Sequence, residues 1–267
     1  MKTCWLIILL VCCSSWVVAQ SDFYATDEIQ TIEIEFEQSN WRVLLDSLKA
    51  NNAEARLEAT VHINGQKFNR AGIRFKGNSS YNSALRDGLI KLPFNIKLDY
   101  FDRSANYQGY QTIKLANGFR DPSMVREVLA YEIAREYMAA PKANFAKVYV
   151  NDAYYGLYTN TESIDRSFLK EHFGDKNGAF FKCDPDYHAE PLPDCRADQK
   201  SDLTYHGNDS ICYLDNYERK SNNISDWNNL IRLTRRLNHH PKKLEDILDI
   251  DAALKMLAFN NLIVNLD

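Results

Sequence analysis

Up to residue 160 the chain alternates apolar and polar residues in short runs, the period of strands with one buried face. The runs are IQTIEIEF, ARLEATVHI, QKFNRAGIRF, LPFNIKLDYF, YQTIKLAN, ANFAKVYV and AYYGLYTN. Asn64-Gly65 separates two of them, and both residues tolerate the positive φ of a tight turn. Asn151-Asp152 separates another two. We therefore predict that this part of the chain is rich in strands, with a hairpin at each of these pairs.

Helical periodicity dominates after residue 160, and two further helices are expected among the strands. We predict helices over residues 39–52, 121–138, 163–174, 225–239 and 249–263. Asp121 and Pro122 suit the start of the second helix, and Gly174 the end of the third. We expect polar loops over GNSSYNSALRDG and over residues 183–223. Strands early and helices late indicate an α+β protein in which a strand-rich lobe leads into a helical one.

The first 20 residues have the form of a secretory signal peptide, because Lys2 precedes a long apolar run that ends at Ala19. An uncleaved anchor is the alternative, but the run is short for a membrane span. After cleavage the chain keeps an excess of acidic residues and no basic stripe that would suit nucleic acid. We expect a secreted protein that has no membrane span after signal cleavage.

Three cysteines remain after the leader, and all lie in the insertion 183–223. In an oxidising compartment two of them are expected to pair. We predict a disulfide between Cys183 and Cys195, with Cys195–Cys212 as the second choice.

Polar side chains on two predicted strands form a candidate anion site. Arg74 and Lys76 share one face of their strand, and Lys97 lies on the polar face of a later one. The loop between them, GNSSY, adds amides and hydroxyls, which together with ammonium groups can hold phosphate. The alternatives are a solvated lysine and an ordinary turn.

In the helix predicted over 121–138, Glu132 falls within the apolar stripe of Val125, Val128, Leu129 and Ile133. A core-facing carboxylate needs a partner, and a helix glutamate paired with a strand lysine positions ATP phosphates in protein kinases. The alternative is a helix-edge glutamate that pairs with Arg135, three residues on.

With these residues in place, the chain resembles the spore-coat protein H (CotH) kinase family. The segments that carry the resemblance are GIRFKGNSS, LPFNIKLDY, LANGFRDPSMVREVLAYEIARE, KVYVNDAYYGLYTNTESIDRSFLKEHFG and NNLIVNLD. The resemblance implies a secreted or surface protein with a divergent protein-kinase-like fold. Residues 21–162 would form the strand-rich, nucleotide-binding lobe, and 163–267 an incomplete helical lobe.

The resemblance also assigns roles. It implies ATP and Mg²⁺ as cofactors, Lys97 as the strand lysine, and Asp267 as the catalytic aspartate. The phosphate-side loop would comprise Arg74, Lys76, Gly77, Ser79 and Ser80. Adenine would lie beside residues 158–162, which end at Glu162.

The family's metal-binding segment follows the catalytic loop, and the sequence stops at Asp267. We therefore expect a truncated, inactive fragment with no metal ligands of its own. The implied activity is phosphorylation of Ser or Thr on an extracytoplasmic protein. The alternative is a non-catalytic surface or coat protein that uses the same fold for adhesion or assembly.

Overall fold

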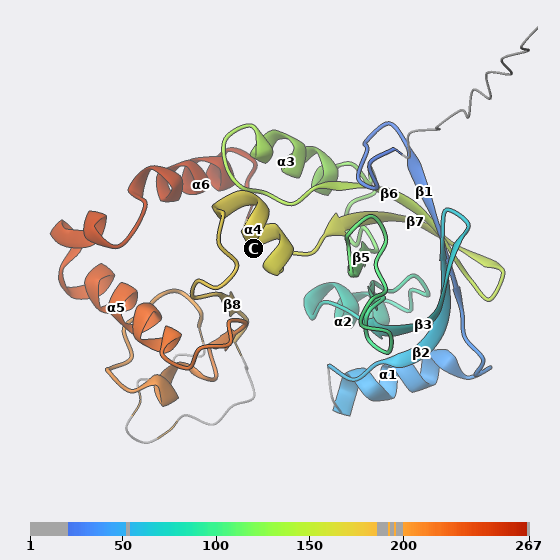
Figure 1. Ribbon diagram of the computed structural model, residues 1–267, viewed down its shortest axis with the longest axis horizontal. Helices are drawn as coiled ribbons and strands as arrows, with labels where there is room; N and C mark the ends of the chain where they lie inside the picture. The colour runs from blue at the N-terminus through green and yellow to red at the C-terminus, as the bar shows by residue number, and fades with distance from the viewer. Residues whose placement is uncertain (1–20, 52–53, 186–191, 193–194, 196–199, 266–267) are drawn as a thin grey trace, which may run out of the picture.

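The computed structural model describes residues 21–51, 54–185, 192, 195 and 200–265. Its centre is a closed barrel in the strand order β1-β2-β3-β4-β5-β7-β6 (Figure 1). Neighbouring strands are antiparallel except β1 and β6, which run parallel from Ile29↔Phe145 to Ile34↔Val150. The predicted leader at 1–20 and Asp267 lie outside the described residues.

The barrel strands follow the predicted alternation closely. Their bounds are β1 Ile29–Glu35, β2 Leu57–Ile63, β3 Gln66–Phe75, β4 Phe94–Lys97, β5 Thr112–Ala116, β6 Ala143–Val150 and β7 Ala153–Glu162. Both predicted hairpins are confirmed, with φ of 50° at Asn64 and 46° at Asn151. The α+β character is therefore confirmed at the level of elements.

The predicted kinase-like, two-lobe fold is wrong, because the strands close into a barrel instead of forming an open sheet in a lobe. Closure depends on β1 finding β6, more than 100 residues later in the sequence. Alternation predicts which face of a strand is buried but not its partner, so it could not reveal this pairing. Residues 158–162, expected to join two lobes, form the second half of β7.

The barrel interior is filled by apolar side chains from all seven strands. They include Ile32, Ile34, Val61, Ile63, Ile73, Phe75, Phe94, Ile96, Ile113, Leu115, Val148 and Tyr158. Burying each such side chain stabilises the fold by about 1.5–3 kcal/mol. At one end, Phe23 and Tyr24 pack against Tyr107 and Tyr110 and complete the core. Asn144 Nδ2 holds this segment by donating to the carbonyls of Phe23 and Ala25, each over 2.9 Å.

Helices α1 (Trp41–Asn51) and α2 (Ser79–Arg86) lie at the other end, where Trp41, Leu45 and Tyr81 join the same core. Helix α2 replaces the polar loop that we predicted over GNSSYNSALRDG. Its Tyr81 packs 5.5 Å from Phe75, ring centre to ring centre, so the polar segment still contributes to the core.

Helix α3 (Arg126–Arg135) lies beside β6 and β7 and begins later than the predicted start at Asp121. Asp121 instead caps the preceding turn by accepting from the Ser123 and Arg126 backbone N–H groups, and Met124 adopts φ 62°. Helix α4 (Arg166–Phe173) ends, as predicted, at Gly174 with φ 72°. No helix in the described part of the chain is both long and apolar enough to cross a bilayer.

The remaining elements form a second cluster on the opposite side of α4 from the barrel (Figure 1). They are β8 Phe181–Cys183, the 3-10 helix η1 Ser210–Tyr213, β9 Tyr217–Arg219, α5 Asp226–His239 and the 3-10 helix η2 Pro241–Asp246. Helix α6 (Ile250–Leu262) follows them and has no buried residue. Trp227, Leu230 and Ile231 of α5 pack on Tyr213 and Tyr217. The described part of the insertion is therefore built around two tyrosines and is more ordered than the predicted loop.

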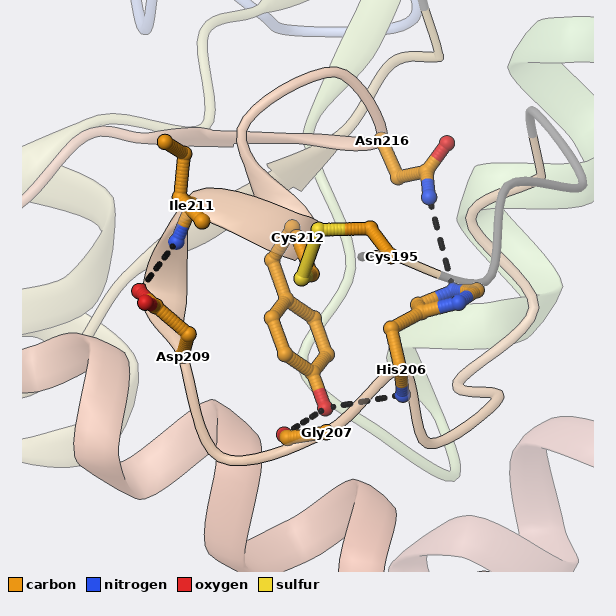
Figure 2. The surroundings of a disulfide bond; sticks show 8 residues. Cys195, His206, Gly207, Asp209, Ile211, Cys212 and Asn216 are labelled. Carbon is orange, nitrogen blue, oxygen red and sulfur yellow. Dashed lines mark hydrogen bonds between the residues drawn. A yellow bond between two sulfur atoms is a disulfide. The ribbon is translucent and has the colours of Figure 1, made fainter. Parts of the chain in front are cut away.

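A disulfide joins Cys195 to Cys212 (Figure 2). The predicted Cys183–Cys195 bond is wrong, and the second choice is confirmed. Cys183 is exposed and free on β8, whereas Cys212 lies on η1. Next to Cys212, the Tyr213 hydroxyl accepts from the His206 N–H and donates to the Gly207 carbonyl, so the loop is also held by its neighbour.

We predict that Cys212→Ser lowers the free energy of unfolding by about 3 kcal/mol, because the bond closes a loop of 17 residues. Urea denaturation followed by tryptophan fluorescence measures this, since Trp227 lies in the adjacent cluster. Cys183→Ser is the matched control and should leave stability unchanged. Equal losses in both variants would contradict the observed pairing.

Candidate functional site

Four polar side chains form a row across the outside of the barrel. Arg74 on β3 pairs with Asn95 on β4, Asn95 with Lys114 on β5, and Lys114 with Thr161 on β7. Their strand neighbours Ile73, Ile96 and Leu115 are core residues, so the row faces outward. Adjacent strands are about 4.8 Å apart, which brings the four side chains within reach of one shared ligand.

Lys76 follows β3 on the same outer face. We call the surface that carries Arg74, Lys76 and Lys114 the cationic face. The pKa of Lys114 falls to about 8, mainly through burial; the charges of Lys76, Lys182 and Arg74 contribute to this fall, and Asp165 opposes it. Burial also lowers the pKa of Lys76, against the opposing effect of Glu127. Among the described residues, no carboxylate lies within 4.0 Å of either ammonium group.

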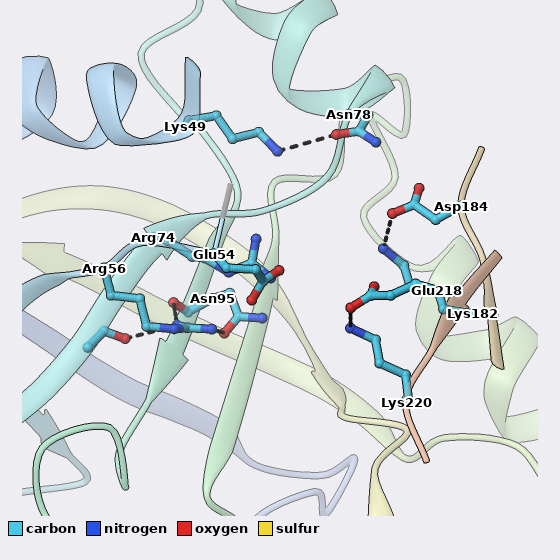
Figure 3. Close-up of polar contacts among 11 residues, drawn as sticks. Lys49, Glu54, Arg56, Arg74, Asn78, Asn95, Lys182, Asp184, Glu218 and Lys220 are labelled. Carbon is cyan, nitrogen blue, oxygen red and sulfur yellow. Dashed lines mark hydrogen bonds and ion pairs between the residues drawn. The ribbon is translucent and has the colours of Figure 1, made fainter. Parts of the chain in front are cut away.

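Neighbouring polar groups hold the cationic face in place (Figure 3). Arg56 donates to the Gly72 and Asn95 carbonyls and to Asn95 Oδ1, at 3.0 to 3.1 Å. Arg74 pairs with Glu54 over 3.0 Å. The pKa of Arg56 falls to about 10, through burial first and the charge of Arg74 second. Arg56 and Arg74 therefore have protein partners, whereas Lys76 and Lys114 are the cations that an incoming anion could neutralise.

The β8–β9 sheet of the second cluster lies next to this surface (Figure 3). Lys182 pairs with Asp184, and Lys220 with Glu218. The Lys182 charge lowers the pKa of both Lys49 and Lys114, so it adds to the positive potential there. The site thus draws cations from the barrel and from the second cluster.

Glu127, and not Glu132, is the carboxylate of α3 that faces the barrel. Its Oε1 accepts from Thr161 Oγ1 over 2.6 Å, and its charge acts on Lys76. Glu132 is exposed, which contradicts the predicted core-facing position. Helix α3 buries the side that carries Val128 and Ala134 instead. The predicted stripe faces outward at Val125, Leu129 and Ile133, which are 46%, 50% and 40% exposed.

Two other predicted site residues, Lys97 and Glu162, lie on opposite sides of the sheet. Lys97 is on the same outer face, but its cross-strand partners are Gly72 and Thr112, one row away from Lys114. Glu162 pairs with Ile113 and is buried, so it points to the opposite side of the sheet from Thr161. Its Oε2 accepts from the Lys142 N–H over 2.9 Å, and burial raises its pKa.

The predicted phosphate-side loop forms a turn into a helix. Gly77 has φ 72°, and a Cβ there would approach Ser80 Oγ to 2.6 Å, so the position requires glycine. Ser79 and Ser80 start α2, whose N-cap residue Asn78 makes no side-chain capping bond. The loop adjoins Lys76, as the sequence predicted, and its role in phosphate binding stays a prediction.

Neither the predicted catalytic role of Asp267 nor a metal site has a structural basis here. Asp267 lies outside the described residues. Within the described ranges, no three His, Cys, Asp or Glu side chains are grouped so that they could hold a metal ion. The acidic residues that the structure places near the cationic face therefore do not fit a Mg²⁺ site, and we assign no step to the metal.

The sequence predicted no role for Lys114 or Glu127, and Thr161 was named only as part of the segment 158–162 expected beside adenine. The alternation in YQTIKLAN places Lys114 on the opposite face of its strand from Ile113 and Leu115, so its outward direction could have been predicted. What the sequence lacked was the order of the strands, which puts Lys114 between Asn95 and Thr161.

Comparison with known proteins identifies the family. Residues 73–267, which include all the side chains of the cationic face, match the family described as CotH kinase protein. The chain belongs to the CotH family. It is also similar to the inner spore coat protein H of Bacillus subtilis (strain 168), with 26% identity over 164 residues. That match covers 59% of this chain and 42% of the relative, so the chain spans less than half of the relative's length. The family suggested by the sequence motifs is confirmed.

We predict that Glu127→Ala lowers the free energy of unfolding by about 1–3 kcal/mol, because it leaves the Thr161 hydroxyl without its charged partner. Glu132→Ala, on the exposed side of the same helix, should change stability by less than about 0.5 kcal/mol. Thermal and urea denaturation measure both. A larger loss of stability for Glu132→Ala than for Glu127→Ala would indicate that Glu132 faces the core, as the sequence predicted.

The lowered pKa of Lys114 predicts a pH dependence of stability. Between about pH 8 and the ordinary value of 10.5, the unfolded lysine binds a proton that the folded one has lost. The free energy of unfolding should therefore rise with pH across this window. Lys114→Met should raise stability at neutral pH and flatten the rise, whereas Lys147→Met, at an exposed position on β6, should do neither. Destabilisation by Lys114→Met would show that the ammonium group already has a favourable partner.

Proposed function

We propose that the protein binds the phosphate groups of ATP at the cationic face and acts as a protein kinase of CotH type. Its acceptor would be Ser or Thr of a secreted or surface protein. The proposal rests on the family and on the chemistry of this face, and it does not require a kinase-like two-lobe fold.

The observation that carries the proposal is the pair Lys76 and Lys114. Burial makes both ammonium groups costly to ionise, and the charge of Lys76 adds to the cost at Lys114. Such groups destabilise a fold unless an anion compensates them. No described carboxylate forms an ion pair with either. A bound phosphate would supply the negative charge, so the cost to stability is consistent with a ligand site.

The surroundings suit a triphosphate better than a single carboxylate. The charges of Arg74 and Lys182 also act on Lys114 and add to the positive potential there. Lys76 adjoins Gly77 and the start of α2. The backbone N–H groups in the first turn of a helix can also bind an anion. ATP supplies the transferable phosphoryl group, and these side chains would bind and orient its phosphates.

The disulfide supports an extracytoplasmic location. Cys195–Cys212 is typical of proteins that mature in an oxidising compartment. This agrees with the leader expected at residues 1–20, whose cleavage we propose but which lies outside the described residues. The named relative is a spore coat protein, which is consistent with a protein that works at a surface.

A non-catalytic coat or surface protein is the second candidate. It is favoured by the name of the relative, an inner spore coat protein. In that case the cationic face would bind an anionic assembly partner, and ATP would have no measurable affinity.

ATP binding separates the two candidates. Isothermal titration calorimetry should give binding to the wild-type protein, and Lys114→Ala should weaken it at least tenfold, or about 1.4 kcal/mol. Lys147→Ala removes a strand lysine on β6 and should leave the affinity unchanged. Lys97→Ala tests the sequence assignment: a tenfold loss there, with none for Lys114→Ala, would transfer the role to Lys97. Absence of ATP binding by wild type would overturn the kinase proposal.

Asp267 is proposed as the residue that accepts a hydrogen bond from the acceptor hydroxyl. In protein expressed from the complete gene, Asp267→Asn should preserve ATP affinity and reduce phosphoryl transfer by a factor on the order of 10²–10⁴. Transfer of radiolabelled phosphate to a protein acceptor measures this. An asparagine variant with the wild-type rate would remove Asp267 from the mechanism.

A further inference from the structure

The end of α5 carries a dense group of basic side chains far from the cationic face. Residues 232–243 contain five Lys or Arg, two His and no Asp or Glu. The whole chain has 32 Lys and Arg against 36 Asp and Glu, so the rest of the protein carries an excess of nine acidic residues. Helix α5 lies across the molecule from the barrel (Figure 1). This stretch is therefore a local excess of positive charge, separate from the cationic face, on a protein whose net charge is negative.

The fold shapes these side chains into a hollow. Helix α5 ends at His239, the backbone turns at His240, and Pro241 starts η2, which packs back against α5. The open hollow between them, of about 380 Å³, is lined by Arg232, Arg235, Arg236, His240 and Lys243. We call these five residues the basic hollow.

Helix stability accounts for only part of this arrangement. Cations in the last turn of a helix interact favourably with its dipole, which explains Arg236 and His239. Arg232 lies well before the last turn, and Lys243 belongs to η2. Over the described residues, no ion pair or side-chain hydrogen bond joins the five members of the basic hollow to another group. These side chains are therefore available to an anionic ligand.

We propose that the basic hollow binds an acidic segment of a polypeptide partner. Arg232 and Arg236 are four residues apart on one helix, about 6 Å along its axis, so they can engage successive carboxylates of a flexible chain. A long, stiff polyanion such as a nucleic acid or a sulfated polysaccharide would extend past the hollow toward the exposed carboxylates of Glu245 and Asp246, which follow Lys243 in η2. A short acidic segment can be confined to the hollow, and so it fits the charge distribution better.

Fluorescence anisotropy of a labelled peptide of Glu-Glu-Gly repeats tests the proposal on the disulfide-bonded protein. The peptide should bind, the affinity should fall as salt is raised, and the matching Gln-Gln-Gly peptide should not bind. Arg232→Gln with Arg236→Gln should weaken binding at least tenfold. Glutamine is a good helix former, so α5 should persist, which circular dichroism and the melting temperature check.

Arg103→Gln with Arg166→Gln is the matched control, because both side chains are exposed and the variant loses the same charge outside the hollow. It should keep wild-type affinity. Equal losses in the two double variants, or equal binding of the Glu and Gln peptides, would overturn the proposal. Tighter binding of heparin than of the Glu peptide would overturn it in favour of a polysaccharide. ATP affinity of the Arg232/Arg236 variant should be unchanged, so failure here is distinct from failure of the proposed kinase function.

Discussion

The parallel pairing of β1 with β6 is the interaction on which the architecture depends. Without it, the strands would form an open sheet with two long exposed edges, and such edges favour aggregation. Closure removes both edges and encloses one apolar core, so every strand has a buried side and an outer side. The outer side then becomes a fixed surface, and cross-strand register alone is enough to align Arg74, Asn95, Lys114 and Thr161.

The cationic face shows how binding chemistry and stability compete. Placing Lys114 in a partly buried position near Lys76 and Arg74 favours its neutral form, as its lowered pKa records. An entirely structural surface would avoid this cost, either with an apolar residue or with a paired carboxylate. Arg74 and Arg56 have such protein partners, and the contrast with the two lysines is what singles the lysines out.

Local features were predictable from the sequence, and long-range ones were not. The alternation in RFK and FNIK correctly placed Arg74, Lys76 and Lys97 on the outer side, because side-chain direction follows from strand period alone. The predicted orientation of Glu132 was wrong because the apolar stripe of α3 was assumed to face the core. The helix instead packs through Val128 and Ala134, beside the hydrogen bond from Thr161 to Glu127. Strand order, barrel closure and the Cys195–Cys212 pairing each depend on segments that meet only in the folded chain.

Phe23 and Tyr24 belong to the barrel core although they lie immediately before the first strand. Asn144 Nδ2 donates to the carbonyls of Phe23 and Ala25, and Gln108 Oε1 accepts from the Phe23 N–H. Packing therefore limits how far the amino-terminal end can be shortened: a truncation that included Tyr24 would remove two aromatic rings from the interior. The same restriction applies to protein engineering, where affinity tags or fusion partners must join upstream of this aromatic pair and leave it free to enter the barrel.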